Sequence, residues 1–265
     1  MVGSAVSSPT ENVALKNGVT TVVDIMTDIY SRDGNQNLKT IENADKFTDW
    51  MYSEVKPYLC KNILEVGSGI GTYSEKLARD FKDSKITVSD IDTKYVNNLK
   101  TRFRNNKNIS CIKLNLENRS DFKNIKHKVD SAIALNVIEH IEDDVGALNK
   151  MYALLEKNGR FVVLVPAHKF LYNCLDESLG HHRRYTKEEM IQKVSMTKFK
   201  INKIFYFNFI SIFGWYLNGN ILKKTIINKN KMKFLNALVP GLKFFEKKIL
   251  RNKIGLSLIV VLEKE

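Results

Sequence analysis

The feature that most constrains this chain is a short apolar run that ends in three alternating glycines. Residues 62–66 have the pattern of a buried strand, and Gly67, Gly69 and Gly71 follow it directly, before a helical pattern begins. Glycine tolerates positive φ and lets a ligand approach the backbone, so this order predicts a nucleotide-cofactor loop in an α/β fold. Thr72 stands where a dinucleotide-binding G-x-G-x-x-G loop would place its third glycine, so the spacing points away from a dinucleotide.

A second signal is an acidic residue at the end of the next predicted strand. Residues 85–90 alternate and are rich in β-branched side chains, and they end in Asp90. That position is close to the roughly 20-residue offset expected of a carboxylate that accepts the hydroxyls of a ribose. The alternative is that Asp90 or Asp92 only caps the helix expected over residues 93–105. Together with the glycine loop, the pattern favours a cofactor site.

Two further predicted strands turn polar where they end. An apolar run over residues 130–135 is followed by Asn136 and Val137, and the strand over residues 109–114 is followed by Asn115 and Leu116. Ligands of open α/β sheets bind at the carboxyl ends of the strands. We therefore expect these exit residues to lie beside the cofactor loop, although a plain strand end and turn would give the same pattern.

Read with Glu65, the glycines form E-x-G-x-G-x-G, and residues 136–141 read N-V-I-E-H-I. Both motifs resemble those of the class I S-adenosyl-L-methionine (SAM) methyltransferases, and the resemblance extends over roughly residues 40–262. It implies SAM as the cofactor, with glycines and Glu65 around its methionine part, Asp90 on its ribose and the exit residues near its adenine and methionine. The cofactor-binding residues implied are Glu65, Gly67, Ser68, Gly69, Gly71, Asp90, Ile91, Asn115, Leu116, Asn136 and Val137.

The chain departs from this family at two places. Many members carry an acidic residue where Asn115 stands, although an amide can still bind the adenine amino group. Methyltransferases of exocyclic base amines usually have an Asp/Asn-Pro-Pro-aromatic turn at the position of Asn136, and Val137 and Ile138 follow here instead. The second departure argues against methylation of a nucleic-acid base.

Residues 171–186 follow the fifth predicted strand and are rich in groups that transfer protons. This segment resembles a bacterial subfamily that acts on small-molecule or lipid-linked acceptors and is sometimes fused to polyprenol-phosphate sugar transferases. His181 is the first candidate for a catalytic base because imidazole titrates near neutrality; Tyr185 and His140 are further catalytic candidates. Structural roles are open for each: His140 as a partner of the cofactor loop, Tyr185 with Thr186 as the start of a helix, and Asp176 in an ion pair with Arg183 or Arg184.

Strands and helices alternate along most of the 265 residues, which predicts an α/β fold with a doubly wound sheet. The family resemblance makes this a Rossmann-like sheet of seven strands, the last antiparallel, with flanking helices and a basic helical insert before the last strand. We expect a flexible arm over residues 1–40, a SAM-binding core over 41–207, the insert over 208–253 and the final strand within 254–265.

The positive charge is concentrated near the insert. Residues 198–253 contain thirteen Lys or Arg and one acid, so they carry +12 of the net +13, interleaved with many aromatic side chains. One interpretation is an interfacial helix on an anionic membrane surface. Each Lys or Arg near that surface contributes up to about 1 kcal/mol to the binding free energy. The other is a lid whose apolar face covers the active site and whose lysines are solvated.

The sequence thus predicts transfer of a methyl group from SAM to a small-molecule or lipid-linked acceptor, with oxygen as the expected atom. An alternative is an RNA methyltransferase, whose basic, aromatic insert would contact phosphates and stack on bases. Another is a SAM-binding regulator without catalytic activity. The missing Pro-Pro turn makes nucleic acid the less favoured partner.

No signal-peptide pattern and no run of about 18 apolar residues is present, which predicts a cytoplasmic protein that can contact the membrane only at its surface. The cysteines are odd in number and far apart, with no histidine at ligand spacing, so neither a disulfide framework nor a metal site is expected from Cys60, Cys111 and Cys174.

Overall fold

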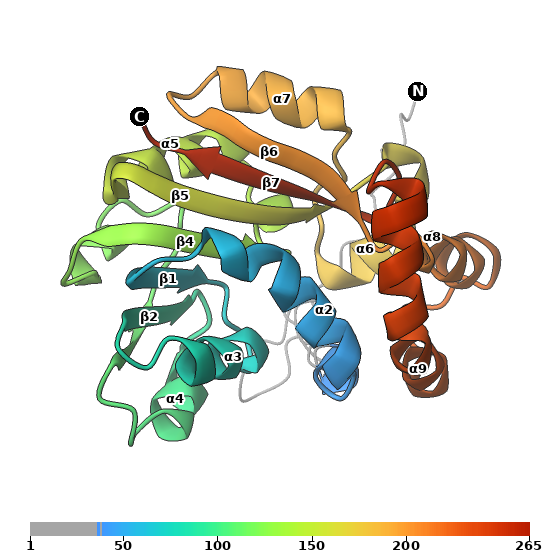
Figure 1. Cartoon of the computed structure of the whole chain (residues 1–265), viewed down its shortest axis with the longest axis horizontal. Coiled ribbons are helices and arrows are strands. Elements are labelled where there is room, and N and C mark those ends of the chain that lie inside the picture. The colour runs from blue at the N-terminus through green and yellow to red at the C-terminus, as the bar shows by residue number, and fades with distance from the viewer. Residues whose placement is uncertain (1–35, 38) are drawn as a thin grey trace, which may run out of the picture.

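The structure is a computed structural model that describes residues 36–37 and 39–265, so nearly all of the predicted N-terminal arm lies outside it. A seven-stranded sheet in the order β3-β2-β1-β4-β5-β7-β6 forms the centre, with helices on both faces (Figure 1). Strand β7 runs antiparallel to β5 and β6, whereas the remaining neighbours are parallel. The predicted fold class is confirmed.

The strands lie close to their predicted positions: β1 (Asn62–Val66), β2 (Lys85–Asp90), β3 (Ile109–Lys113), β4 (Val129–Leu135), β5 (Leu155–Pro166), β6 (Lys200–Phe207) and β7 (Ser257–Glu263). The α-helices described are α2 (Asp45–Val55), α3 (Thr72–Asp80), α4 (Thr93–Arg102), α5 (Asp144–Leu154), α6 (Cys174–Leu179), α7 (Lys187–Ser195), α8 (Ser211–Trp215) and α9 (Lys229–Phe245). Short 3-10 turns cover Lys56–Tyr58, Asp121–Asn124, Ile138–His140 and Lys169–Leu171.

The central strands β1, β4 and β7 are buried on both faces, which explains why they are largely apolar. In β7, Leu258, Val260 and Leu262 pack into the core on one face, and Ile259 and Val261 pack into the core on the other. The side chains of a strand alternate between faces, so a run without polar residues fits only a strand that is covered on both sides.

One boundary differs from the prediction. The sequence pattern predicts a helix over residues 143–157 and a strand over residues 160–165, but the helix ends at Leu154 and β5 begins at Leu155. Leu155 pairs with Val129, and the register with β4 shifts between Val129 and Ser131. Asn158 takes a positive φ of 62° and donates its N–H to the carbonyl of Lys264. Neighbouring strands therefore supply the backbone partners that draw these residues into the sheet.

The insert is helical, as predicted, and packs on the core. It contains α8, α9 and two π-helical turns, Tyr216–Ile221 and Glu246–Leu250. Asn236 Oδ1 accepts from Phe47 N at 2.9 Å, and Lys243 Nζ donates to Ser53 Oγ at 2.8 Å, which joins α9 to α2. Within the described part of the chain, we find no helix with the length and apolar character needed to cross a membrane.

Candidate active site

A cavity of about 1130 Å³ opens where the carboxyl ends of β1, β2 and β4 meet the insert. Ten of the eleven predicted cofactor residues line it: Glu65, Gly67, Ser68, Gly69, Asp90, Ile91, Asn115, Leu116, Asn136 and Val137. The parallel strands share one edge, so residues far apart in the chain come together there.

Gly71 is the exception, because it is not among the residues that line the cavity. It precedes α3 with a φ of 92°, and an added Cβ would lie 3.0 Å from Leu99 Cδ2 of α4. Its glycine is therefore required by the left-handed turn and by the close packing of α3 on α4.

The first part of the loop is folded onto the end of β2. Gly69 donates its N–H to Asp90 Oδ2 at 2.8 Å, and Ser68 donates its N–H to the carbonyl of Ser89 at 2.8 Å. Gly67 has a φ of 69°, and a Cβ there would overlap the side chain of Val137. Backbone conformation and the approach of the β4 exit thus both exclude a side chain at Gly67.

The acidic residues at the end of β2 have separate roles. Asp92 caps α4 by accepting from Lys94 N at 2.7 Å, so the helix-capping alternative applies to Asp92. Asp90 is buried beside the cavity, and burial raises the pKa of its carboxyl. Its Oδ1 accepts from Asp92 N and its Oδ2 from Gly69 N. Each oxygen of a carboxylate has a second lone pair, so Asp90 can accept further hydrogen bonds from a ligand.

Glu65 lies at the end of β1 and is almost fully buried. Burial raises the pKa of its carboxyl to about 7, against the opposing effect of a hydrogen bond donated by Ser74 Oγ. A cation in the cavity would favour the ionised carboxylate, since opposite charges within a few ångströms lower an acidic pKa. The position therefore suits a ligand with a positive charge.

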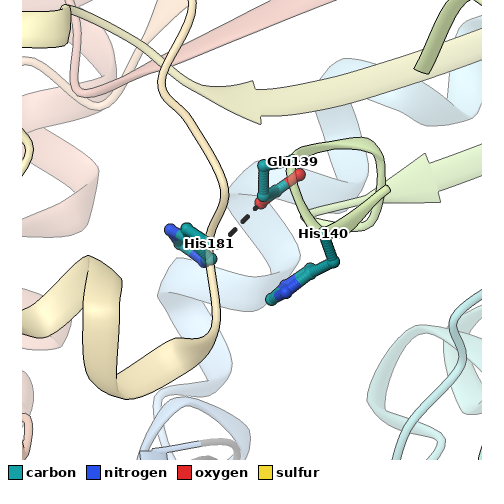
Figure 2. Close-up of side chains that lie close together, drawn as sticks. All are labelled: Glu139, His140 and His181. Atoms are coloured by element: carbon teal, nitrogen blue, oxygen red, sulfur yellow. Dashed lines mark ion pairs between the residues drawn. The ribbon is translucent and has the colours of Figure 1, made fainter. Parts of the chain in front are cut away.

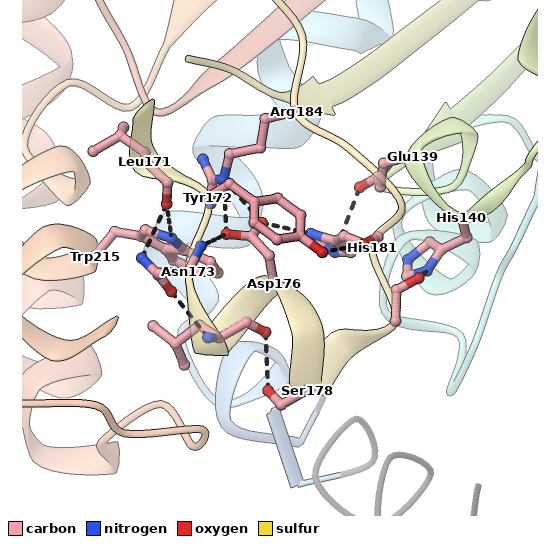
Figure 3. Close-up of polar contacts among 12 residues, drawn as sticks. Glu139, His140, Leu171, Tyr172, Asn173, Asp176, Ser178, His181, Arg184 and Trp215 are labelled. Atoms are coloured by element: carbon pink, nitrogen blue, oxygen red, sulfur yellow. Dashed lines mark hydrogen bonds and ion pairs between the residues drawn. The ribbon is translucent and has the colours of Figure 1, made fainter. Parts of the chain in front are cut away.

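Asp176 forms polar contacts with His181 and Arg184, which line the cavity (Figure 3). His181 Nδ1 donates to Asp176 Oδ1 at 2.8 Å, and Arg184 Nε lies 2.9 Å from both carboxylate oxygens. Burial favours the neutral carboxyl, but the donors His181 and Arg184 bring the pKa of Asp176 below its ordinary value. Of the two ion pairs foreseen, Asp176 forms the one with Arg184, whereas Arg183 pairs with Asp144 at 3.0 Å.

Two of the three predicted catalytic residues line the cavity. His140 and His181 have ring centroids 4.8 Å apart, and Figure 2 shows Glu139 beside them. His140 Nδ1 donates to the carbonyl of Gly180 at 3.1 Å, so its partner is the loop after α6 and not the glycine loop. Desolvation of the ring and the neighbouring His181 lower the pKa of His140 to about 4, and burial raises the pKa of Glu139 to about 8. His140 is therefore neutral near pH 7.

Tyr185 is placed elsewhere. It is fully buried, it is not among the residues lining the cavity, and its hydroxyl donates to Asp144 Oδ2 at 2.9 Å. Burial raises the pKa of this hydroxyl above its ordinary value. Thr186 caps α7 by accepting from Glu189 N at 3.1 Å, as the alternative interpretation foresaw. Tyr185 is thus a packing residue that anchors the segment carrying His181.

The insert supplies a wall of the cavity that had no assigned residues in the sequence analysis. Its lining side chains include Ile210, Phe213, Trp215, Leu217, Met232 and Leu235. Trp215 stacks under Arg184, whose Cζ lies 4.6 Å from the ring centroid. In the sequence, the interleaved aromatic and basic residues could indicate only a lid over the active site. The packing of the insert shows which of these residues face the cavity.

The match to known proteins covers the cofactor half of this site. Residues 64–161 match the family model described as a methyltransferase domain, and this segment holds all eleven predicted cofactor residues. The chain carries a methyltransferase domain over this segment. Malonyl-[acyl-carrier protein] O-methyltransferase 1 of Ilyobacter polytropus is 26% identical to the chain over 238 residues, which cover 83% of the chain and 85% of that relative.

Other relatives of this methyltransferase domain are parts of much larger proteins. Probable polyketide synthase 42 of Dictyostelium discoideum is 28% identical over 153 residues, which cover 49% of the chain and 6% of the synthase. Geranyl diphosphate C-methyltransferase of Streptomyces coelicolor, solved with Mg²⁺, geranyl diphosphate and S-adenosyl-L-homocysteine, superposes with a TM-score of 0.57 at 9% identity over 81% of this chain and 77% of that one. At that identity the superposition supports the fold alone.

Proposed function

We propose that this methyltransferase transfers the methyl group of SAM to an oxygen atom of a small lipophilic or lipid-linked acceptor. The observation that carries the proposal is a single cavity lined both by the glycine loop, Glu65 and Asp90 and by His140 and His181. Methyl transfer is an in-line displacement, so a site that aligns donor and acceptor supplies most of the catalysis.

The cofactor half provides a suitable group for each part of SAM. Asp90 retains acceptor capacity for the ribose hydroxyls, and Asn115 lies at the strand exit expected to meet the adenine. Glu65 is the buried carboxyl beside the methionine part, where SAM carries both an ammonium and a sulfonium. These positively charged groups of SAM would favour the ionised form of Glu65, and their attraction to the carboxylate would contribute to the affinity for SAM.

The acceptor half suggests an oxygen nucleophile in an apolar setting. His140 and His181 each engage Nδ1 in a hydrogen bond, which leaves Nε2 available, and we assign the acceptor oxygen to the space beside them. The relative from Ilyobacter is named as an O-methyltransferase, in agreement with this assignment. Phe213, Trp215 and Leu235 of the insert give the cavity an apolar wall that suits a lipophilic acceptor.

Incubation with methyl-labelled SAM and a whole-cell extract, followed by separation of organic and aqueous phases, tests this function. We expect release of S-adenosyl-L-homocysteine and label in the organic phase. Label confined to the aqueous phase would contradict the lipophilic acceptor and direct attention to soluble metabolites or RNA. Binding of SAM without any labelled product would contradict catalysis and support a regulatory protein.

We further propose that the outer surface of α9 contacts an anionic membrane, from which a lipid-linked acceptor would enter. Leu238 and Phe245 are exposed and lie seven residues apart, so they share one side of α9, and Ile249 in the following π-helical turn is exposed as well. Exposed lysines accompany them, among them Lys233, Lys247 and Lys248. An apolar stripe with flanking cations is typical of a helix that lies in the membrane interface.

Leu238→Ser should weaken binding to vesicles of phosphatidylglycerol and phosphatidylcholine about tenfold, because burying a Leu side chain contributes roughly 1.5–3 kcal/mol. Co-sedimentation measures the bound fraction, and wild-type binding should fall as salt is added. Ile191→Ser in α7 is the matched control, because Ile191 is 41% exposed and Leu238 is 42% exposed. Equal binding by both variants would show that α9 does not contact the bilayer.

A further inference from the structure

Glu139 is a buried carboxyl without a hydrogen-bond partner. Its side chain has no exposed surface, and neither of its oxygens forms a hydrogen bond with any residue that the structure describes. His181 Nε2 lies 3.9 Å from Glu139 Oε1, beyond hydrogen-bond distance (Figure 2). A buried polar group normally has a partner, because desolvation without one is costly. Both oxygens of Glu139 are therefore available to bind a ligand.

The two neighbouring histidines are oriented by carbonyl and carboxylate oxygens. His181 Nδ1 donates to Asp176 Oδ1 at 2.8 Å, and His140 Nδ1 donates to the carbonyl of Gly180 at 3.1 Å. Since these oxygens can only accept, both Nδ1 atoms carry the proton and both Nε2 atoms carry a lone pair. A histidine that binds a metal usually donates its other ring N–H to such a group, which fixes the tautomer.

The three side chains lie at distances that a metal ion can bridge. One ligand atom each from Glu139, His140 and His181 lies within 4.8 Å of the other two. Zinc–nitrogen and zinc–oxygen bonds of about 2.0–2.2 Å at tetrahedral angles place two ligand atoms roughly 3.3–3.6 Å apart, so side-chain movements of about 1 Å would complete the site. Glu139 and His140 belong to the 3-10 turn after β4, and His181 follows α6.

We propose that Glu139, His140 and His181 bind one divalent transition-metal ion of the zinc type at the acceptor end of the cavity. This inference rests on the proposed methyl transfer, because it specifies the chemistry of the acceptor. Two imidazoles and one carboxylate are a ligand set of catalytic zinc sites and of related sites with open positions. His140 and His181 line the cavity, so an open position would be accessible to the acceptor.

The acceptor class that fits this site has an ionisable oxygen, as in a carboxylate, an enol or a phenol. The cation binds that oxygen and stabilises its negative charge, and a hydroxyl acceptor releases its proton to water. A lone pair of the oxygen forms the new bond to the methyl carbon, and the electrons of the methyl–sulfur bond remain on sulfur, which yields S-adenosyl-L-homocysteine. His181 then acts as a metal ligand rather than as the base expected from the sequence.

Titration of the chelator-treated full-length chain with Co²⁺, followed by visible absorption and equilibrium dialysis, tests the site. We expect one Co²⁺ per chain, intense visible bands of a four- or five-coordinate ion, and displacement by Zn²⁺. Glu139→Gln and His140→Ala should each weaken binding more than about 100-fold, since even outer partners of a ligand contribute 10–100-fold. His182→Ala is the matched control, because it removes an exposed imidazole adjacent to His181 and should bind Co²⁺ normally.

Calorimetry with SAM on the same proteins separates this inference from the proposed function. All variants should bind SAM as the wild type does, because none of the three ligands is among the residues proposed to bind SAM. Normal SAM binding with no Co²⁺ uptake by the wild type, or with unchanged Co²⁺ affinity in Glu139→Gln, would overturn the metal site and leave methyl transfer standing. Failure of the wild type to bind SAM would instead overturn the proposed function.

Discussion

Gly69→Arg is expected to abolish SAM binding, with at least about a 100-fold loss of affinity. Gly69 has a φ of 52° and lines the cavity, and its N–H donates to Asp90. An arginine there would occupy the cofactor space, strain the left-handed backbone by about 1–2 kcal/mol and pair with the carboxylate proposed to bind ribose. Isothermal titration calorimetry measures the loss.

Gly241→Arg is the control for this substitution. Gly241 lies in α9, where an added Cβ meets no described atom within 4 Å, so the same change of residue should leave SAM affinity intact. Asp90→Ala should weaken SAM binding by about tenfold or more, because hydrogen bonds to a charged group contribute roughly 1.5–3 kcal/mol. Wild-type affinity in Gly69→Arg would show that the cofactor binds elsewhere.

Asp176→Ala is expected to lower the free energy of unfolding by about 3–5 kcal/mol. The side chains of Asp176 and Arg184 are 0% and 1% exposed, and Asp176 also accepts from Asn173 N and His181 Nδ1. Its removal leaves the guanidinium of Arg184 buried without its counter-ion and the ring of His181 without its acceptor. Urea unfolding followed by circular dichroism measures the change.

Asp49→Ala provides the comparison for an exposed ion pair. Asp49 contacts Lys76 at 2.6 Å, but its side chain is 53% exposed, so its loss should cost less than about 1 kcal/mol. The double variant Asp176→Leu/Arg184→Met should regain much of the stability, since apolar pairs of similar volume often replace buried ion pairs without loss. If Asp176→Ala were no less stable than Asp49→Ala, the buried pair would not support the acceptor end.

The cofactor half of the site was predictable because its signals are local. A strand, a glycine turn and a helix are contiguous, and parallel strands bring their carboxyl ends to one edge of the sheet. Gly67, Gly69 and Asp90 therefore face the cavity as predicted. Gly71 and Asp92 illustrate the limit of such patterns, because a glycine needed for helix packing and an aspartate that caps a helix look the same in sequence as ligand-binding residues.

The acceptor half depended on tertiary structure. The sequence pattern after β5 could not distinguish His181 from Tyr185. His181 lines the cavity, whereas the hydroxyl of the buried Tyr185 donates to Asp144. Glu139 and His140 come close to His181 only because the turn after β4 and the loop after α6 converge, across more than 40 positions of the chain.

The sequence by itself determined the α/β fold, the order of its elements and the glycine loop, because periodicity and turn chemistry act over a few neighbouring residues. Only the tertiary structure decided which polar side chains of the acceptor segment meet Glu139. It also decided that the insert lines the cavity with Trp215 while exposing Leu238. These outcomes depend on how α9 packs on α2 and on the burial of Asp176 with Arg184, and such contacts between distant segments have no signature in local sequence.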